Sequence, residues 1–268
     1  MSTNRRIQVG DIEMSYRWDG ADEGPVVMMA HAMGTSHALW DPQVDRLAAR
    51  HRILRYDWRG HGNTSAPTGP YSLAQFVNDA CGLMDALDVP WVHWVGISTG
   101  GMIGQGLGIH QAERIRSLTL CNTTSQATPW YRDWVAERQA LVKAEGMAPV
   151  WERTKRLWFT DAFVDAEGPA YAGVRDVFVR TPVAGYLGGT SAVAELAYRD
   201  DLHRISVPTL VLGAGADPVT PPEQTNEIAR RIPGARVMFL EGQRHFSNVE
   251  QPAAFTAALA AFLNEVVS

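Results

Sequence analysis

One glycine-flanked segment places a serine where a nucleophile is needed. Gly96-Ile97-Ser98-Thr99-Gly100 matches the G-x-S-x-G pattern, in which a serine occupies a sharp turn between a strand and a helix. The apolar run WVHWV precedes this segment, and a helical pattern from Thr99 to His110 follows it. The flanking glycines let the turn close, and we expect Ser98 in a strained backbone conformation that projects its hydroxyl. The segment predicts a nucleophilic serine at a strand end.

A serine hydroxyl needs a neighbouring base to accept its proton. Of the eight histidines, His245 has the most suitable position, because it lies between the last predicted strand and the last predicted helix. Asp217 follows the strand-like run TLVLG, and a carboxylate there can orient the imidazole and stabilise its protonated form. We therefore predict Ser98 as nucleophile, His245 as general base and Asp217 as the orienting acid.

Two backbone N–H groups are predicted to bind the negative charge that develops on the substrate carbonyl oxygen. Thr99 opens the helix after Ser98, and Met33 lies in the loop that follows the apolar run VVMMA. His31 begins the same loop, and we expect it to brace the loop, with substrate contact as the alternative. No cysteine or carboxylate accompanies His31 at metal-ligand spacing, so the sequence predicts no metal site.

Strand and helix patterns alternate along most of the chain, which predicts an α/β fold with a mostly parallel central sheet and helices on both faces. A hairpin is predicted at 6–9 and 12–18, with further strands at 26–30, 51–57, 91–96, 115–121, 208–213 and 236–240. Helices are predicted at 37–50, 73–87, 99–110, 222–231 and 252–267.

The segment 125–199 interrupts this alternation, because it is helical in pattern, rich in tryptophan and without clear strands. We predict a helical lid inserted into a core domain formed by 1–124 and 200–268. Such a lid would cover the strand ends, where open α/β sheets bind ligands. Ordinary packing of lid on core is the alternative for its aromatic side chains, of which four are candidates to line an apolar pocket: Trp130, Trp134, Trp158 and Tyr186.

Composition excludes several other classes of protein. The 268 residues carry a net charge of −5, which gives no basic surface for nucleic acid or an anionic membrane. Cys81 and Cys121 are the only cysteines, and we interpret them as free thiols in a reducing compartment. No apolar run has the length of a signal peptide or a membrane span. These features predict a cytoplasmic protein, and they leave its oligomeric state open.

Several longer segments resemble the 3-oxoadipate enol-lactonases, a group within the α/β-hydrolase superfamily. They include RYDWRGHG with a following GPY, MGTSHALWDPQ, GISTGGMIGQ, PTLVLGAGADPVTPP and HFSNVEQPAAF. The resemblance implies the α/β-hydrolase fold with Ser98, Asp217 and His245 as triad and Met33 and Thr99 as oxyanion donors. The chain departs from the family at His31-Ala32 and at Thr99, and the lid is the least similar segment. An oxoadipate-type substrate would require a carboxylate anchor, for which the lid offers Arg132, Arg138, Arg175 and Arg180. The alternative for each of these arginines is a place on a solvated helix face.

The predicted function is hydrolysis of a lactone or carboxylic ester through an acyl-enzyme on Ser98, without a metal or organic cofactor and with a small molecule as the only partner. The same triad also serves carbon–carbon hydrolysis of a ring-cleavage product and perhydrolysis with peroxide. A ligand receptor that signals through a moving lid, without turnover, is an alternative from another class.

Overall fold

A mostly parallel sheet of eight strands forms the centre of the computed structural model, which describes residues 4–267. The strand order is β1-β2-β4-β3-β5-β6-β7-β8. The pairs β1–β2 and β2–β4 are antiparallel, and every later pair is parallel. The predicted α/β class is confirmed. The strands are β1 (Arg5–Val9), β2 (Ile12–Gly20), β3 (Val26–Ala30), β4 (Arg52–Tyr56), β5 (Val92–Ile97), β6 (Ile115–Cys121), β7 (Thr209–Ala214) and β8 (Arg236–Leu240).

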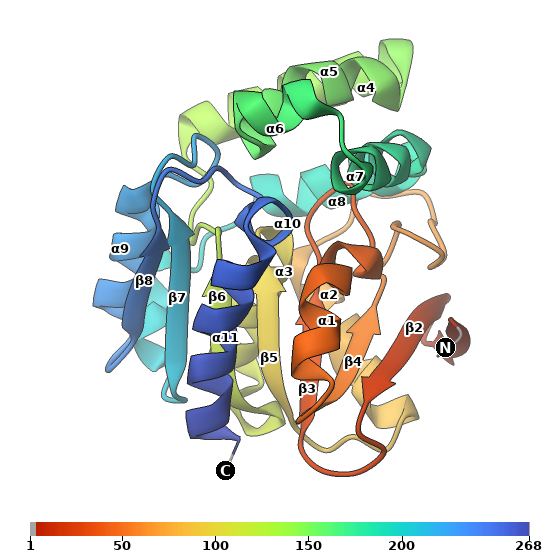
Figure 1. The fold of residues 1–268 in the computed structure, drawn as a ribbon. Coiled ribbons are helices and arrows are strands. Elements are labelled where there is room, and N and C mark those ends of the chain that lie inside the picture. Colours follow the sequence, from red (N-terminus) through yellow and green to blue (C-terminus); the bar gives the residue numbers. More distant parts are fainter. Residues whose placement is uncertain (1–3, 268) are drawn as a thin grey trace.

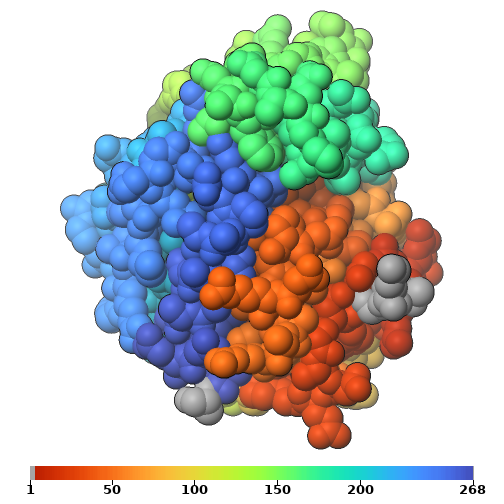
Figure 2. Space-filling model, in the orientation of Figure 1, coloured from red at the N-terminus to blue at the C-terminus, as the bar shows by residue number. Residues whose placement is uncertain are grey.

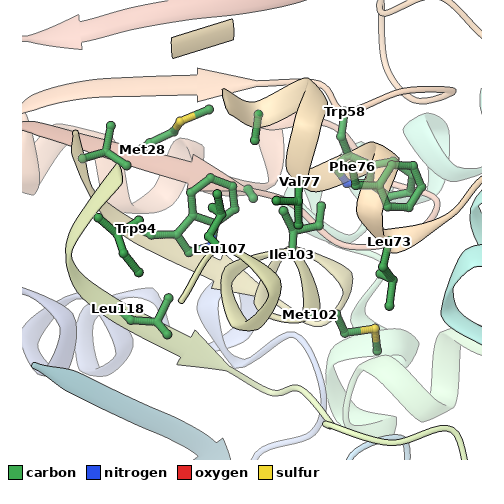
Figure 3. Close-up of a cluster of buried hydrophobic side chains, with 14 of the residues drawn as sticks. Met28, Trp58, Leu73, Phe76, Val77, Trp94, Met102, Ile103, Leu107 and Leu118 are labelled. Carbon is green, nitrogen blue, oxygen red and sulfur yellow. The ribbon is translucent and has the colours of Figure 1, made fainter. Parts of the chain in front are cut away.

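Helices cover both faces of this sheet (Figure 1). The core-domain helices are α1 (Asp41–Leu47), α2 (Leu73–Ala86), α3 (Thr99–His110), α9 (Pro222–Arg231), α10 (Ser247–Glu250) and α11 (Pro252–Val266), with short 3-10 turns at His37–Trp40, Ala112–Arg114 and Arg199–Arg204. Side chains alternate along each strand, because successive residues of a strand point to opposite faces. Met28 therefore packs with α2 and α3, in the cluster of Figure 3, whereas Val27 and Met29 pack with α1 and α11.

Local signals explain where two of these helices begin. Ser72 caps α2: its Oγ accepts from Gln75 N at 3.1 Å, and Gln75 Oε1 accepts from Ser72 N at 2.8 Å. The single helix predicted at 37–50 is wrong, because a 3-10 turn precedes α1. Pro42 lies in the first turn of α1, where the missing N–H costs no hydrogen bond. Arg50 N and His51 N both donate to Leu47 O, which closes the helix early.

The helical insertion comprises α4 (Pro129–Glu145), α5 (Met147–Trp158), α6 (Asp161–Ala166), α7 (Pro169–Arg180) and α8 (Val183–Ala194). Its two ends lie side by side, because Ala127 N donates to Leu196 O at 2.8 Å and Tyr198 N donates to Ser125 O at 2.9 Å. In Figure 1 these helices lie beyond the carboxyl ends of the parallel strands, and Figure 2 shows the core and insertion in continuous contact. The insertion therefore covers the sheet edge to which the predicted site belongs.

Two further features concern the helices and the cysteines. None of the helices described within residues 4–267 combines the length and hydrophobicity that crossing a bilayer requires. Cys81 and Cys121 are both free thiols, as predicted, and burial raises the pKa of each.

Candidate active site

Ser98 occupies the turn between β5 and α3 in a conformation that few non-glycine residues adopt. Its φ is +53° and its ψ is −114°, which L-residues reach only at a cost in backbone strain. Two hydrogen bonds hold it there: Ser98 N donates to Cys121 O at 2.9 Å, and Thr123 Oγ1 donates to Ser98 O at 2.7 Å. The strained turn expected from the sequence is present.

The glycines on either side of Ser98 are required by close backbone approaches. A Cβ on Gly96 would lie 2.1 Å from the carbonyl oxygen of Gly100, and a Cβ on Gly100 would lie 2.2 Å from that of Ala30. Both distances are far inside van der Waals contact, and the obstructing atoms are backbone, so no side-chain movement relieves them. This packing also places the loop after β3 directly beside the turn at Ser98.

Asp217 and His245 form a buried pair at the same edge of the sheet. His245 Nδ1 lies 2.7 Å from Asp217 Oδ2, and the two residues are 1% and 2% exposed. Asp217 follows β7 and His245 follows β8, as predicted. Because a carboxylate only accepts hydrogen bonds, Nδ1 carries the proton and Nε2 is left as the basic nitrogen. A neutral histidine in this tautomer is the form that a general base requires.

Asn122 and Thr220 complete the surroundings of Asp217, and sequence reasoning missed both. Oδ2 accepts from Asn122 Nδ2 at 3.1 Å and from Thr220 Oγ1 at 2.7 Å, while Oδ1 accepts from the backbone N–H groups of Val219 and Thr220. Burial alone would raise the pKa of the Asp217 carboxyl. The interaction with His245 and the hydrogen bonds that His245 and Thr220 donate outweigh burial and hold that pKa below its ordinary value.

Parallel strand order brings the three predicted triad residues to one sheet edge. Ser98 follows β5, Asp217 follows β7 and His245 follows β8, so all three lie at the carboxyl ends of parallel strands of one sheet. Asn122, at the end of the intervening strand β6, joins them: it bonds Asp217 through Nδ2 and accepts from Ser247 Oγ at 3.4 Å. The catalytic roles of the three residues stay predictions.

The two predicted oxyanion donors follow the ends of two paired strands, β3 and β5. Thr99 is the first residue of α3, so its N–H has no acceptor within that helix. Within residues 4–267, Met33 N donates no hydrogen bond, and the strand before Met33 pairs with β5 through Ala30 and Gly96. Free N–H groups at this edge are suited to bind a carbonyl oxygen that gains negative charge.

His31 is buried inside the loop rather than exposed beside Ser98. It is 0% exposed and its ring stacks on Trp58 at 5.2 Å. Nδ1 bonds Ala32 O within the loop, and Nε2 accepts from Trp58 N in the loop after β4. Burial lowers its pKa to about 4, so the ring is neutral at neutral pH. This geometry favours the loop-bracing interpretation over substrate contact.

The four candidate aromatic residues of the insertion have different surroundings. Trp158 packs on Phe246, the residue after His245, with ring centroids 4.3 Å apart, and Tyr186 packs on Phe178 at 5.9 Å. Trp134 is half-buried under Arg138, whereas Trp130 is 60% exposed. Trp158 therefore contacts the residue next to the predicted base, and Trp130 lies on the outer surface.

A family model described as the alpha/beta hydrolase fold matches residues 25–252. The chain belongs to the α/β-hydrolases. Among residues 4–267 of this hydrolase, no group of three or more histidine, cysteine or acidic side chains is arranged to hold a metal ion.

Similar α/β-hydrolases include proteins named for two kinds of substrate. 3-oxoadipate enol-lactonase 2 of Acinetobacter baylyi is 32% identical over 253 residues, which covers 94% of each chain. A relative in Azorhizobium caulinodans, named for carbamate hydrolysis, is 29% identical and covers 96% of this chain and 97% of its own. The solved structure of the enol-lactonase from Burkholderia xenovorans LB400 superposes with a TM-score of 0.93 at 35% identity, covering 97% of this chain and 100% of that one.

Proposed function

We propose that this α/β-hydrolase cleaves a lactone or carboxylic ester through an acyl-enzyme on Ser98. The observation that carries the proposal is the buried His245–Asp217 pair at the sheet edge where Ser98 projects from its strained turn. A neutral imidazole held in one tautomer by a carboxylate is an effective base for a serine hydroxyl.

The mechanism assigns one step to each group. His245 Nε2 accepts the proton of Ser98 Oγ as the oxygen attacks the substrate carbonyl, and the N–H groups of Met33 and Thr99 bind the resulting oxyanion. Collapse of the tetrahedral intermediate breaks the ester bond, and His245 gives its proton to the departing oxygen. In a lactone that oxygen stays on the acyl chain. His245 then accepts a proton from water as the water attacks the acyl-enzyme, and it returns that proton to Ser98 Oγ as the bond between Oγ and the acyl carbon breaks and the acid leaves.

Arg138 supports a substrate that carries a carboxylate. It lies on α4 and is 5% exposed, yet it forms no ion pair with any of residues 4–267; the neighbouring Glu137 pairs with Arg153 instead. Its Nε has no hydrogen-bond partner, and its one hydrogen bond, from Nη2 to Thr154 Oγ1, is long at 3.5 Å. Burial lowers the pKa of Arg138, which shows the cost of keeping this cation out of water without an anion.

Helix α8 lies between Arg138 and the predicted oxyanion loop and connects the two. The guanidinium of Arg138 lies 3.5 Å from the ring centre of Trp134. The next residue, Gln139, donates to Thr190 Oγ1 at 3.0 Å on α8, the helix that also carries Tyr186. One turn after Tyr186, a Cβ on Gly189 would lie 3.0 Å from Met33 Sδ. Arg132, Arg175 and Arg180 are exposed by comparison. Of the four candidate anchors, Arg138 is therefore the one suited to a carboxylate enclosed under the lid, as on a 3-oxoadipate enol-lactone.

Arg138→Met is expected to raise KM for an enol-lactone with a free carboxylate by about tenfold to a hundredfold, because a charge-assisted hydrogen bond is lost. The methyl ester of the same lactone should react within about twofold of the wild-type rate, since it has no charge to bind. Steady-state kinetics on the two substrates measure the difference. Arg175→Met, on the exposed face of α7, is the matched control. An equal loss on both substrates would rule out Arg138 as the anchor.

A substrate panel assayed on the wild type and on Ser98→Ala tests the reaction class. We expect turnover that depends on Ser98 and is fastest on carboxylated enol-lactones. Faster turnover of a carbamate would favour the activity for which the Azorhizobium relative is named. One slow acylation without turnover would favour a receptor.

The free thiols Cys81 and Cys121 support a reducing compartment such as the cytoplasm.

A further inference from the structure

The peptide between Ala32 and Met33 has its carbonyl bound from one side. Ala32 O accepts three hydrogen bonds: from Thr35 Oγ1 at 2.8 Å, from His31 Nδ1 at 2.9 Å and from Thr35 N at 3.3 Å. The last bond closes a turn whose third residue, Gly34, has φ +70°, as a type II turn requires. A carbonyl with three donors is more heavily bonded than a turn alone needs.

The carbonyl of Ala32 and the N–H of Met33 belong to the same peptide group. In a planar trans peptide these two groups point in opposite directions, and the cis bond in residues 4–267 lies elsewhere, at Gly69-Pro70. Donors that hold Ala32 O on one side therefore direct Met33 N–H to the other side. Within residues 4–267 that N–H has no acceptor, so a ligand atom is free to occupy the position it faces.

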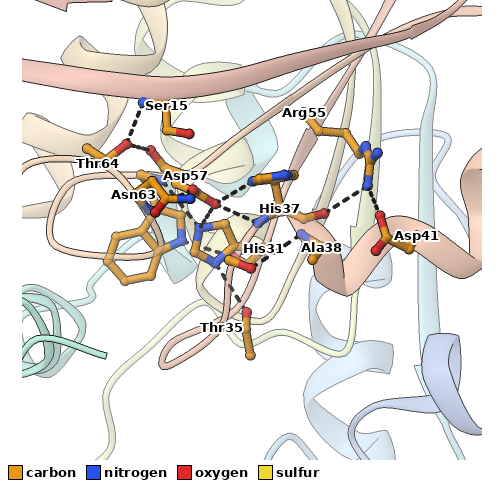
Figure 4. A network of polar contacts seen from close by, with 12 residues as sticks. Ser15, His31, Thr35, His37, Ala38, Asp41, Arg55, Asp57, Asn63 and Thr64 are labelled. Carbon is orange, nitrogen blue, oxygen red and sulfur yellow. Dashed lines mark hydrogen bonds and ion pairs between the residues drawn. The ribbon is translucent and has the colours of Figure 1, made fainter. Parts of the chain in front are cut away.

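His31 can donate to Ala32 O because its other ring nitrogen accepts. Trp58 N donates to His31 Nε2 at 3.3 Å, which assigns the ring proton to Nδ1. Asp57 lies behind the ring, with Oδ1 4.0 Å from Nε2 and 2.9 Å from His37 Nδ1. Figure 4 shows His31 between Asp57 on one side and Thr35 on the other. Trp58 N therefore fixes the ring at Nε2, while Nδ1 donates to Ala32 O.

We infer that Thr35 and His31 are positioning residues for the oxyanion hole, acting by fixing the orientation of the Ala32–Met33 peptide. The inference rests on the proposed function, because it assigns Met33 N–H to the substrate oxyanion. Neither side chain touches the reacting atoms. Loss of one donor to Ala32 O lets the peptide rotate, and the N–H then points at the oxyanion for a smaller fraction of the time.

Thr35→Val and Thr35→Ser separate this role from simple packing. Valine keeps the shape of the buried Thr35 side chain without its hydroxyl, and serine restores the hydroxyl. With 4-nitrophenyl acetate, Thr35→Val should lower kcat about tenfold with KM within about twofold, because an oxyanion contact acts in the transition state. Thr35→Ser should recover most of kcat. Phenylboronic acid, which forms a tetrahedral adduct on the nucleophile, should bind Thr35→Val about tenfold more weakly.

Three outcomes would overturn the inference: wild-type kcat in Thr35→Val, an equal loss of kcat in Thr35→Ser, or unchanged affinity for phenylboronic acid. Melting temperatures of both variants identify a loss that merely follows unfolding. Should Thr35→Val not fold, Thr35→Ala carries the same test with a smaller side chain. Turnover that persists in Ser98→Ala would refute the proposed function itself, whereas Ser98-dependent turnover with full activity in Thr35→Val would refute this inference alone.

Discussion

Ser98→Ala is expected to lower kcat for ester or lactone hydrolysis by about 10⁴-fold or more while the protein keeps its fold. Only the hydroxyl group is removed, so the oxygen that forms the acyl-enzyme is lost. The bonds from Ser98 N to Cys121 O and from Thr123 Oγ1 to Ser98 O involve backbone atoms that alanine retains. Initial rates with 4-nitrophenyl acetate and a thermal unfolding curve measure the two effects separately.

Ser206→Ala is the matched control, because Ser206 is exposed in the segment before β7 and lies outside the site. It should retain the wild-type kcat and melting temperature. Turnover by Ser98→Ala above about 1% of the wild-type rate would contradict a nucleophilic Ser98, since removal of a triad nucleophile costs far more than that.

Asp217→Asn is expected to lower kcat by about 10³- to 10⁴-fold, because the amide favours the wrong histidine tautomer. The hydrogen-bond partners of the carboxylate are all donors: Asn122 Nδ2, Thr220 Oγ1, two backbone N–H groups and His245 Nδ1. An asparagine must turn its own NH₂ group toward some of them. That clash of donors should also destabilise the fold by about 1–3 kcal/mol.

The activity of Asp217→Asn is measured as kcat across a pH range and its stability as the free energy of unfolding in urea. Asp45→Asn, on the exposed side of α1, makes the same chemical change at a position with no role in the account. It should match the wild type in both measurements. If Asp217→Asn keeps a tenth or more of kcat, the His245–Asp217 pair does not act as proposed.

The placement of Ser98, Asp217 and His245 at one sheet edge was predictable, because each carries a local signal that combines with strand order. Ser98 has its glycine-flanked pattern, and Asp217 and His245 each follow an apolar strand, so parallel pairing alone places them at one edge. Asn122 carries no such signal. It bonds a carboxylate 95 residues away in the sequence, and only the assembled sheet brings the two together. Thr220 lies close to Asp217 in sequence, but threonine in a turn has many other uses.

The burial of individual residues in the insertion was less predictable, because it depends on how the helices pack together. Trp130 and Trp134 are equally hydrophobic and lie on the same helix, yet Trp130 is 60% exposed and Trp134 is half-buried. Arg132 and Arg138 differ in the same way. Which face of α4 is buried depends on where α5 and α8 lie, and that is a tertiary contact.

The four residues of α10 are too few for a periodic signal to appear.

Covalent labelling with diethyl 4-nitrophenyl phosphate identifies the nucleophile directly. The reagent phosphorylates a serine that is activated by a base, with release of 4-nitrophenolate. We expect one diethylphosphoryl group per chain, located by peptide mass spectrometry on Ser98, with hydrolytic activity lost in proportion to labelling. Asp217→Asn should label far more slowly. Full hydrolytic activity in completely labelled protein, or inactivation with the label on another residue, would contradict Ser98 as the nucleophile.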